Sequence, residues 1–313
     1  MSSNLDWKTN DYSKKDQAIQ AVEIETNQFN LGEMSKKAPL LNVCALAVKR
    51  LVAPNVLADV AKNATYSYVR RVAVEKLNDQ DVLADVTKNN PNMYSAVEKL
   101  DDQDVLADIA KNNTDPYARI AAVEKLDDQA LLADVAKNDL DPDVRRLAVN
   151  MLTDQALLAD VAKNATDPDI RRVAVEKLND QALLADVAKN DPDLYVRRVA
   201  VNRLTDQDVL ADVAKNATYS EVCRVAVNRL TDQALLADVA KNANNADICR
   251  IATKELTDQD VLADVAKNAA RSIARIVAVN RLTDQALLAD VAKNATDPYL
   301  CKIAKQRLKD LDK

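Results

Sequence analysis

Residues 153–178 read TDQALLADVAKNATDPDIRRVAVEKL, and this unit recurs along most of the 313-residue chain. A Leu-Ala-Asp triplet marks ten units, with its aspartate at Asp59, Asp85, Asp108, Asp134, Asp160, Asp186, Asp212, Asp238, Asp264 and Asp290. The spacing of these aspartates is constant, except that the step from Asp85 to Asp108 is three residues shorter than the others. Self-similarity at a fixed short period is typical of repeat proteins, in which each unit packs against its neighbours.

The apolar residues of one unit form two helical stripes. These are Leu157, Leu158, Val161 and Ala162 in the first half, and Ile170, Ala174, Val175 and Leu178 in the second. Helices of about three turns are marginal alone in water, so each must bury its stripe against neighbouring units. We therefore predict an all-α fold, a right-handed α-solenoid (superhelix) of about ten 26-residue two-helix repeats with atypical terminal caps.

We divide the chain into three parts. Residues 1–15 form a polar leader that we expect to be disordered. Residues 16–51 form a degenerate N-terminal capping repeat, with irregular helices expected at 16–27 and 37–51. Residues 52–313 form the ten tandem repeats, and the last acts as a C-terminal cap because Lys305 takes the place that Val175 has in an internal unit.

Polar residues at the ends of the first helix predict its caps. The residue that opens it is Asn, Asp or Thr, as at Asn78, Asp101 and Thr153, and such side chains cap helix N-termini. The helix ends in Asn in every unit, as at Asn164, which we interpret as a left-handed C-cap. The Asn-Ala-Thr triplet at Asn164 also fits a glycosylation sequon, but we favour capping.

The second helix opens with Asp-Pro in several units, an N-cap followed by the residue best suited to the first helical position. The stretch Asp141-Pro-Asp-Val-Arg-Arg146 resembles the second helix of HEAT repeats, and the short unit is similar to the leucine-rich repeat variant and other HEAT-like bacterial solenoids. The resemblance covers about residues 40–313. It implies an α-solenoid with an arginine ladder between units, but such solenoids serve many unrelated roles.

The composition excludes several classes of chemistry. With no His there is no His-dependent nucleophile or metal ligand, and a single Gly excludes phosphate-cradling loops. Carboxylates recur in every unit, whereas a catalytic pair needs one special environment. We therefore predict no catalytic, cofactor-binding or metal-binding residue, and we expect a protein that is not an enzyme.

Features of targeting and redox chemistry point to the cytoplasm. No run reaches the length of a membrane span, and the N-terminus has no apolar signal segment. Four cysteines, none in a Cys-x-x-Cys pair, indicate free thiols. We expect a cytoplasmic monomer that does not bind membranes.

One repeat position borders the apolar stripe of the second helix. It holds Cys44, Arg70, Met93, Arg119, Arg145, Arg171, Arg197, Cys223, Cys249, Arg275 and Cys301. Replacement of Arg by Cys or Met predicts a buried arginine stem with a paired head. Neighbouring units are about 8–10 Å apart, too far for a disulfide.

The candidate partner-binding residues lie on the other side of the second helix. They are an arginine column (Arg71, Arg146, Arg172, Arg198, Arg224 and Arg250), Asn202 and Asn228, where earlier units have Glu, and the tyrosines Tyr68, Tyr117 and Tyr195. Along the later units, Asn largely replaces Glu beside the arginine column, while the arginines remain. The second helices can therefore present a basic face although the net charge of the chain is -6. The simpler interpretation is that these charges solvate an exposed surface and pair with one another.

Three functions remain open. The first is a non-catalytic scaffold or adaptor that binds a protein or peptide partner along the repeat surface. The alternative is nucleic-acid binding along the arginine column, against which stand a pI near 5.0 and few aromatic residues. A remote alternative, implied by the resemblance alone, is a HEAT-like enzyme such as an alkylpurine DNA glycosylase or a bilin lyase.

Overall fold

The computed structural model describes residues 7–90 and 94–311, apart from the Asn89 side chain. Within these ranges the chain forms helices and no strand. It divides into two compact units, Met1–Leu152 and Thr153–Lys313, at a boundary that the sequence analysis did not predict. The predicted all-α solenoid is confirmed, because consecutive helices pair and successive pairs stack within each unit.

The first unit begins with a short 3-10 turn and continues with paired helices. Its elements are η1 (Tyr12–Lys14), α1 (Lys15–Ile24), α2 (Gln28–Lys37), α3 (Leu41–Arg50), α4 (Pro54–Asn63), α5 (Ser67–Glu75), α6 (Gln80–Asn89), α7 (Tyr94–Val97), α8 (Gln103–Asn112), α9 (Pro116–Val123), α10 (Gln129–Asn138) and α11 (Pro142–Met151). The shortened repeat, which contains Asp85, includes the short helix α7. Met93, predicted for the buried column, lies outside the described residues.

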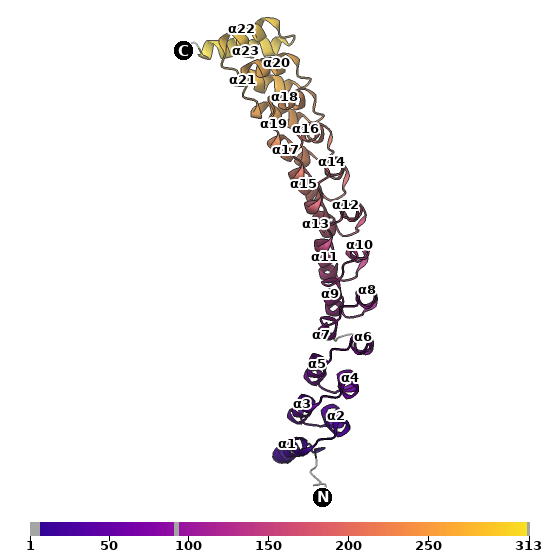
Figure 1. Cartoon of the computed structure of the whole chain (residues 1–313). Helices are drawn as coiled ribbons and strands as arrows, with labels where there is room; N and C mark the ends of the chain where they lie inside the picture. Colours follow the sequence, from indigo (N-terminus) through magenta and orange to yellow (C-terminus); the bar gives the residue numbers. More distant parts are fainter. Residues whose placement is uncertain (1–6, 91–93, 312–313) are drawn as a thin grey trace. The chain divides into compact units, whose positions relative to one another are not determined.

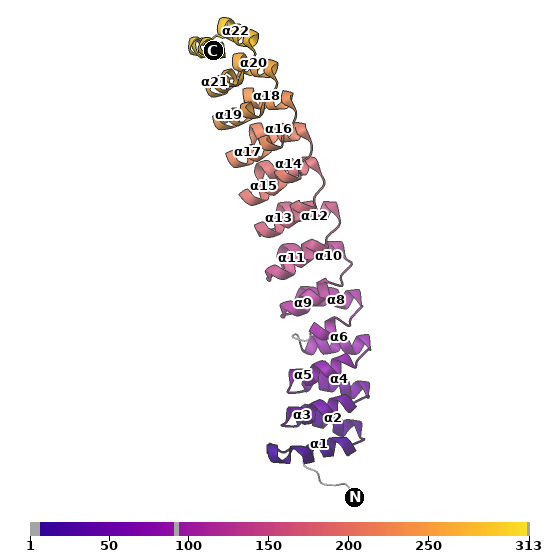
Figure 2. The same cartoon turned by 90° about the vertical axis from the view of Figure 1, so that its left-hand side faces the viewer.

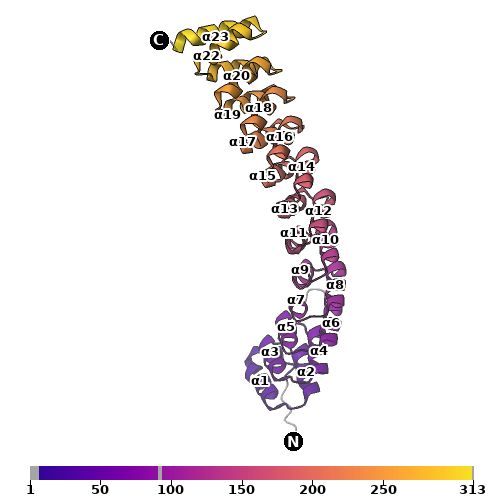
Figure 3. The same ribbon diagram turned by 45° about the horizontal axis from the view of Figure 1, so that its top comes forward.

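The second unit is more regular. Its helices are α12 (Gln155–Asn164), α13 (Pro168–Lys177), α14 (Gln181–Asn190), α15 (Leu194–Arg203), α16 (Gln207–Asn216), α17 (Ser220–Arg229), α18 (Gln233–Asn242), α19 (Ala246–Glu255), α20 (Gln259–Asn268), α21 (Ser272–Arg281), α22 (Gln285–Asn294) and α23 (Pro298–Leu311). From α2 onward, even-numbered first helices and odd-numbered second helices form two layers within each unit (Figures 1, 2 and 3).

The core lies between the two layers. Leu158, Val161, Ile170 and Leu178 are at most 2% exposed, as the helical stripes predict, whereas Leu157 is half-buried. Burying an aliphatic side chain of this size stabilises a fold by about 1.5–3 kcal/mol. The short helices therefore owe their stability to the stack.

The N-cap prediction is wrong by one residue. The cap is the aspartate that follows the variable residue: Asp154 accepts hydrogen bonds from the backbone N–H groups of Ala156 (2.8 Å) and Leu157 (3.1 Å). The variable residue has another role, since the N–H of Thr205 donates to Gln181 Oε1 of the preceding repeat at 2.7 Å. A carboxylate next to the first helical residue is the stronger acceptor for the orphan N–H groups.

The left-handed C-cap is also wrong. No non-glycine residue within 7–90 and 94–311 has a positive φ, and Ala165, which follows α12, is extended with φ -63° and ψ 133°. Asn164 instead ends the helix and donates from Nδ2 to Asp160 Oδ1 at 2.6 Å. The recurring asparagine therefore serves a side-chain hydrogen bond one turn back along the helix.

The N-terminal region differs from the two irregular helices that we expected. Three helices are present, and α2 lies largely in the stretch that the sequence analysis left between them. Lys36 and Cys44 stand one repeat period before Lys62 and Arg70, so α2 and α3 have the form of a complete repeat. Residues 1–6 of the expected leader lie outside the described residues, and Tyr12–Lys14 form the 3-10 turn η1.

Candidate partner-binding face

A ladder of ion pairs joins the first helices of successive repeats. Lys189 Nζ lies 2.8 Å from Asp212 Oδ2, and Lys241 Nζ lies 2.7 Å from Asp264 Oδ2. The hydrogen bond from Lys189 lowers the pKa of Asp212, although partial burial opposes it. The aspartate of the Leu-Ala-Asp triplet therefore holds repeats together, and we call these pairs the Lys–Asp ladder.

A second set of contacts joins the second helices. Near the end of α17, Arg229 donates to the backbone carbonyls of Asn202 (2.8 Å) and Leu204 (2.7 Å) at the end of α15. Arg203 donates in the same way to Leu178 O at 3.0 Å. The last carbonyls of a helix have no partner within it and attract cations. This role was not predicted, although Lys or Arg recurs at this position in most repeats.

The buried column behaves as predicted. Arg171, only 7% exposed, donates from Nε and Nη2 to the carboxylate of Asp191 in the next repeat (2.9 and 3.1 Å) and from Nη1 to Ala165 O (2.9 Å). Where Cys replaces Arg, the thiol contacts the equivalent carbonyl, as Cys249 Sγ does with Ala243 O at 3.3 Å. All four cysteines are free, and burial raises the pKa of Cys44 to about 11.

The exposed side of the second helices holds the predicted binding residues. Tyr117 is 69% exposed and Tyr195 is 66% exposed, whereas Tyr68 is 37% exposed. The Arg71 guanidinium lies over the Tyr68 ring, 5.6 Å from the ring centre. Asn202 and Asn228 are exposed on α15 and α17. We use the name tyrosine–arginine face for these residues in each unit taken separately. They are Tyr68, Arg71, Tyr117 and Arg146 in the first unit, and Arg172, Tyr195, Arg198, Asn202, Arg224, Asn228 and Arg250 in the second.

The structure does not support a strongly basic arginine column. Four of the arginines pair with an acid three residues earlier on the same helix: Arg146 with Asp143 (3.8 Å), Arg172 with Asp169 (3.5 Å), Arg224 with Glu221 (2.5 Å) and Arg250 with Asp247 (3.3 Å). Arg224 lowers the pKa of Glu221, and Arg198 on the preceding second helix adds to this effect. The face is thus mixed in charge.

One hollow brings two predicted residues of consecutive repeats together. It lies between α13 and α15, has a volume of about 540 Å³, and is lined by Pro168, Asp169, Arg172, Asp193 and Tyr195. Arg172 also pairs with Glu176 at 3.0 Å. The hollow therefore offers an exposed phenol ring, a guanidinium and carboxylates to the same ligand.

One exposed aromatic residue of the second unit is absent from the predicted set. Tyr219 is 46% exposed, and its ring centre lies 4.3 Å from the Arg197 guanidinium in the buried column. It precedes α17 where other repeats have a capping Asp, and this departure from the pattern was visible in the sequence.

Comparisons with known proteins leave the family open. The scan against protein families and the search of curated proteins found no match. A solved structure reported under "Computational Design of Self-Assembling Cyclic Protein Homooligomers" aligns over 94% of this chain and 86% of its own, with 13% identity and a TM-score of 0.10. Similarity at this level does not show a shared fold. The chain is a tandem repeat of helical hairpins, and no described helix has the length and apolar character needed to cross a membrane.

Proposed function

We propose that the chain is a non-catalytic, monomeric scaffold that binds a protein or peptide through the tyrosine–arginine face. The observation that carries this proposal is the hollow between α13 and α15, where Tyr195, two-thirds exposed, lies with Arg172. Tyr and Arg are enriched where proteins bind one another, because each combines apolar contact area with hydrogen bonding. The free thiols are what we expect of a cytoplasmic protein.

The division of labour between the two layers supports this face. The first helices are nearly identical, and their recurring Lys, Asp, Asn and Gln side chains bond within a repeat or between repeats. The outer positions of the second helices vary among Tyr, Asp, Glu and Ile. Variation on a surface that stacking does not need is typical of binding solenoids, and it fits the resemblance to HEAT-like repeats.

The mixed charge favours a peptide or protein with both acidic and basic side chains. Nucleic acid is the second candidate. We rank it below a protein partner because four arginines of the column already pair with a carboxylate of their own helix. A phosphate backbone would have to displace these carboxylates or lie beside them, which reduces the electrostatic gain.

The test is selection of random peptides against the immobilised chain, followed by affinity measurements. We expect Tyr195→Ala combined with Arg172→Ala to weaken selected peptides by about tenfold or more. The matched control is Tyr12→Ala, since Tyr12 is 69% exposed outside this face. Peptides that bind both variants equally well would place the site elsewhere.

Two further measurements separate the candidates. Arg172→Glu combined with Arg198→Glu should alter partner binding at little cost in stability, because Arg198 is exposed and half-buried Arg172 loses only surface ion pairs with Asp169 and Glu176. Binding to a random DNA duplex is compared at about 50 and 200 mM salt. Tight binding that collapses at the higher salt would replace the protein scaffold by a nucleic-acid binder.

A further inference from the structure

The Lys–Asp ladder is interrupted at the shortened repeat. Lys88 occupies the lysine position of α6, and Asp108 on α8 follows it three positions sooner than Asp212 follows its ladder partner Lys189. Lys88 forms no ion pair or hydrogen bond with any residue in the described part of the chain. Lys111 on α8 likewise forms no ion pair with Asp134 on α10. Lys88 and Asp108 therefore lack the ion-pair partners that the equivalent residues have elsewhere in the ladder.

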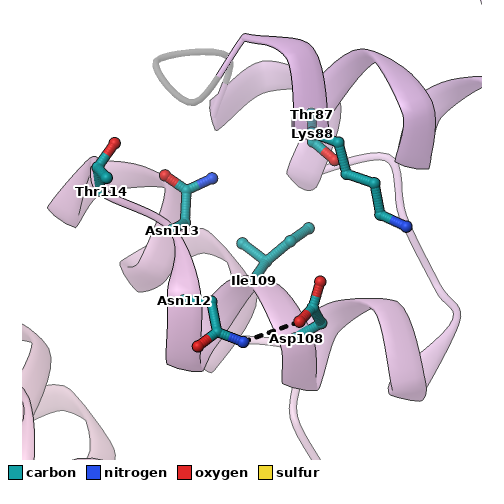
Figure 4. Close-up of a pocket in the computed structure, with 7 residues that line it drawn as sticks. All are labelled: Thr87, Lys88, Asp108, Ile109, Asn112, Asn113 and Thr114. Carbon is teal, nitrogen blue, oxygen red and sulfur yellow. Dashed lines mark hydrogen bonds between the residues drawn. The ribbon is translucent and has the colours of Figure 1, made fainter.

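A hollow of about 280 Å³ lies beside these two residues, and the equivalent hollow beside the Lys163–Asp186 pair (3.7 Å) is smaller, about 160 Å³. Lys88 and Thr87 line it from α6, and Asp108, Ile109 and Asn112 line it from α8. Figure 4 shows Lys88 and Asp108 on opposite sides of the opening. Asn112 Nδ2 donates to Asp108 Oδ1 at 2.9 Å, while Oδ2 is the oxygen that accepts the lysine in closed pairs.

We propose that this α6–α8 hollow binds a small zwitterion, an amino acid or dipeptide, with its carboxylate on Lys88 and its ammonium group on Asp108. The ligand takes the place of the missing ion pair, since it offers each charged side chain the opposite charge. The volume suits one or two residues, and Ile109 provides an apolar wall for a ligand side chain.

Ligands with one charge fit the hollow less well. An anion on Lys88 faces the Asp108 carboxylate across the opening, and a cation on Asp108 faces the Lys88 ammonium group. A ligand with one charge would thus lie near a like charge on the opposite wall, which disfavours its binding. The two walls together therefore select for a ligand that carries both signs. This inference is independent of the tyrosine–arginine face, whose residues do not line this hollow.

The test is titration calorimetry of the full chain with the twenty amino acids and glycylglycine, and with propionate and propylamine as single-charge probes. We expect at least one zwitterion to bind, and Lys88→Gln and Asp108→Asn each to weaken it about tenfold, the value of one charge-assisted hydrogen bond. Lys88 and Asp108 are exposed, so both variants should fold, which circular dichroism checks. The control is Lys215→Gln, because Lys215 pairs with Asp238 in a closed part of the ladder.

Three results would overturn the proposal. The first is an absence of binding by every zwitterion up to about 10 mM. The second is propionate or propylamine binding as tightly as the best zwitterion, which would mean that only one of the two charged side chains, Lys88 or Asp108, contributes to recognition. The third is equal weakening by Lys215→Gln, which would show that the site depends on the ladder in general.

Discussion

The buried ion pair between Arg171 and Asp191 allows a quantitative test of how successive repeats are joined. Both side chains are at least nine-tenths buried, with contacts of 2.9 Å and 3.1 Å. Removing one partner of such a pair leaves an uncompensated charge and costs about 3–5 kcal/mol. Because Arg171 Nη1 keeps its bonds to Ala165 O and Thr166 O, we expect Asp191→Ala to cost about 3 kcal/mol, the lower end of that range.

The chain itself provides the compensating change. Cys223 and Ala243 occupy the same two repeat positions as Arg171 and Asp191, and there the thiol contacts Ala217 O at 3.2 Å. Arg171→Cys combined with Asp191→Ala copies this natural pair. Replacing a buried ion pair by apolar groups is often neutral, but Asp191 Oδ1 also accepts a hydrogen bond from the Asp193 N–H (2.8 Å), which contributes about 0.5–1.5 kcal/mol. We therefore expect the double variant to lie within about 1.5 kcal/mol of the wild type.

The assay combines urea unfolding with amide hydrogen exchange. Repeat arrays need not unfold in one step, so exchange in α13, α14 and α15 reports the local change directly. Two outcomes would refute the reasoning. One is a cost below about 1 kcal/mol for Asp191→Ala. The other is a double variant as unstable as the sum of its single variants, because the pair would then not be coupled.

Three other predictions concern the core, the thiols and the Lys–Asp ladder. Leu178→Ala should cost about 2–5 kcal/mol in urea unfolding, because Leu178 is 1% exposed; a loss below about 1 kcal/mol would contradict its place in the core. With a disulfide reagent at pH 8, partly exposed Cys301 should react first and Cys44, with its pKa of about 11, only on unfolding; equal rates in the folded chain would speak against this burial. Lys241→Ala should cost about 0.5 kcal/mol at neutral pH, since both side chains of its pair with Asp264 are partly exposed. The hydrogen bond from Lys241 lowers the pKa of Asp264 below its ordinary value of 3.8. The pair therefore stabilises the fold above that pH, and the stabilisation is lost as pH falls through the folded pKa. The difference between wild type and Lys241→Ala should therefore vanish in acid, and a difference that persisted would show that the lysine acts through packing.

Some features of the candidate site could have been predicted from the sequence alone. The spacing of Asp169 and Arg172, three residues apart on a helix, already predicts an ion pair on one turn. The pairing of these arginines with acids of their own helix was therefore predictable. That Arg172 lies near Tyr195 was not. Arg172 and Tyr195 share a hollow only because α13 and α15 stack in a particular register.

The sequence by itself determined the repeat, the two helical stripes and the buried column, because each depends on the periodicity of a single helix. Only the tertiary structure decided which polar side chain contacts which neighbour. The Lys–Asp ladder joins side chains from successive first helices, and Arg229 reaches carbonyls at the end of another helix. Such contacts depend on the register between stacked helices, and they are not made in every repeat, since Lys88 and Asp108 line the α6–α8 hollow instead of forming a ladder pair.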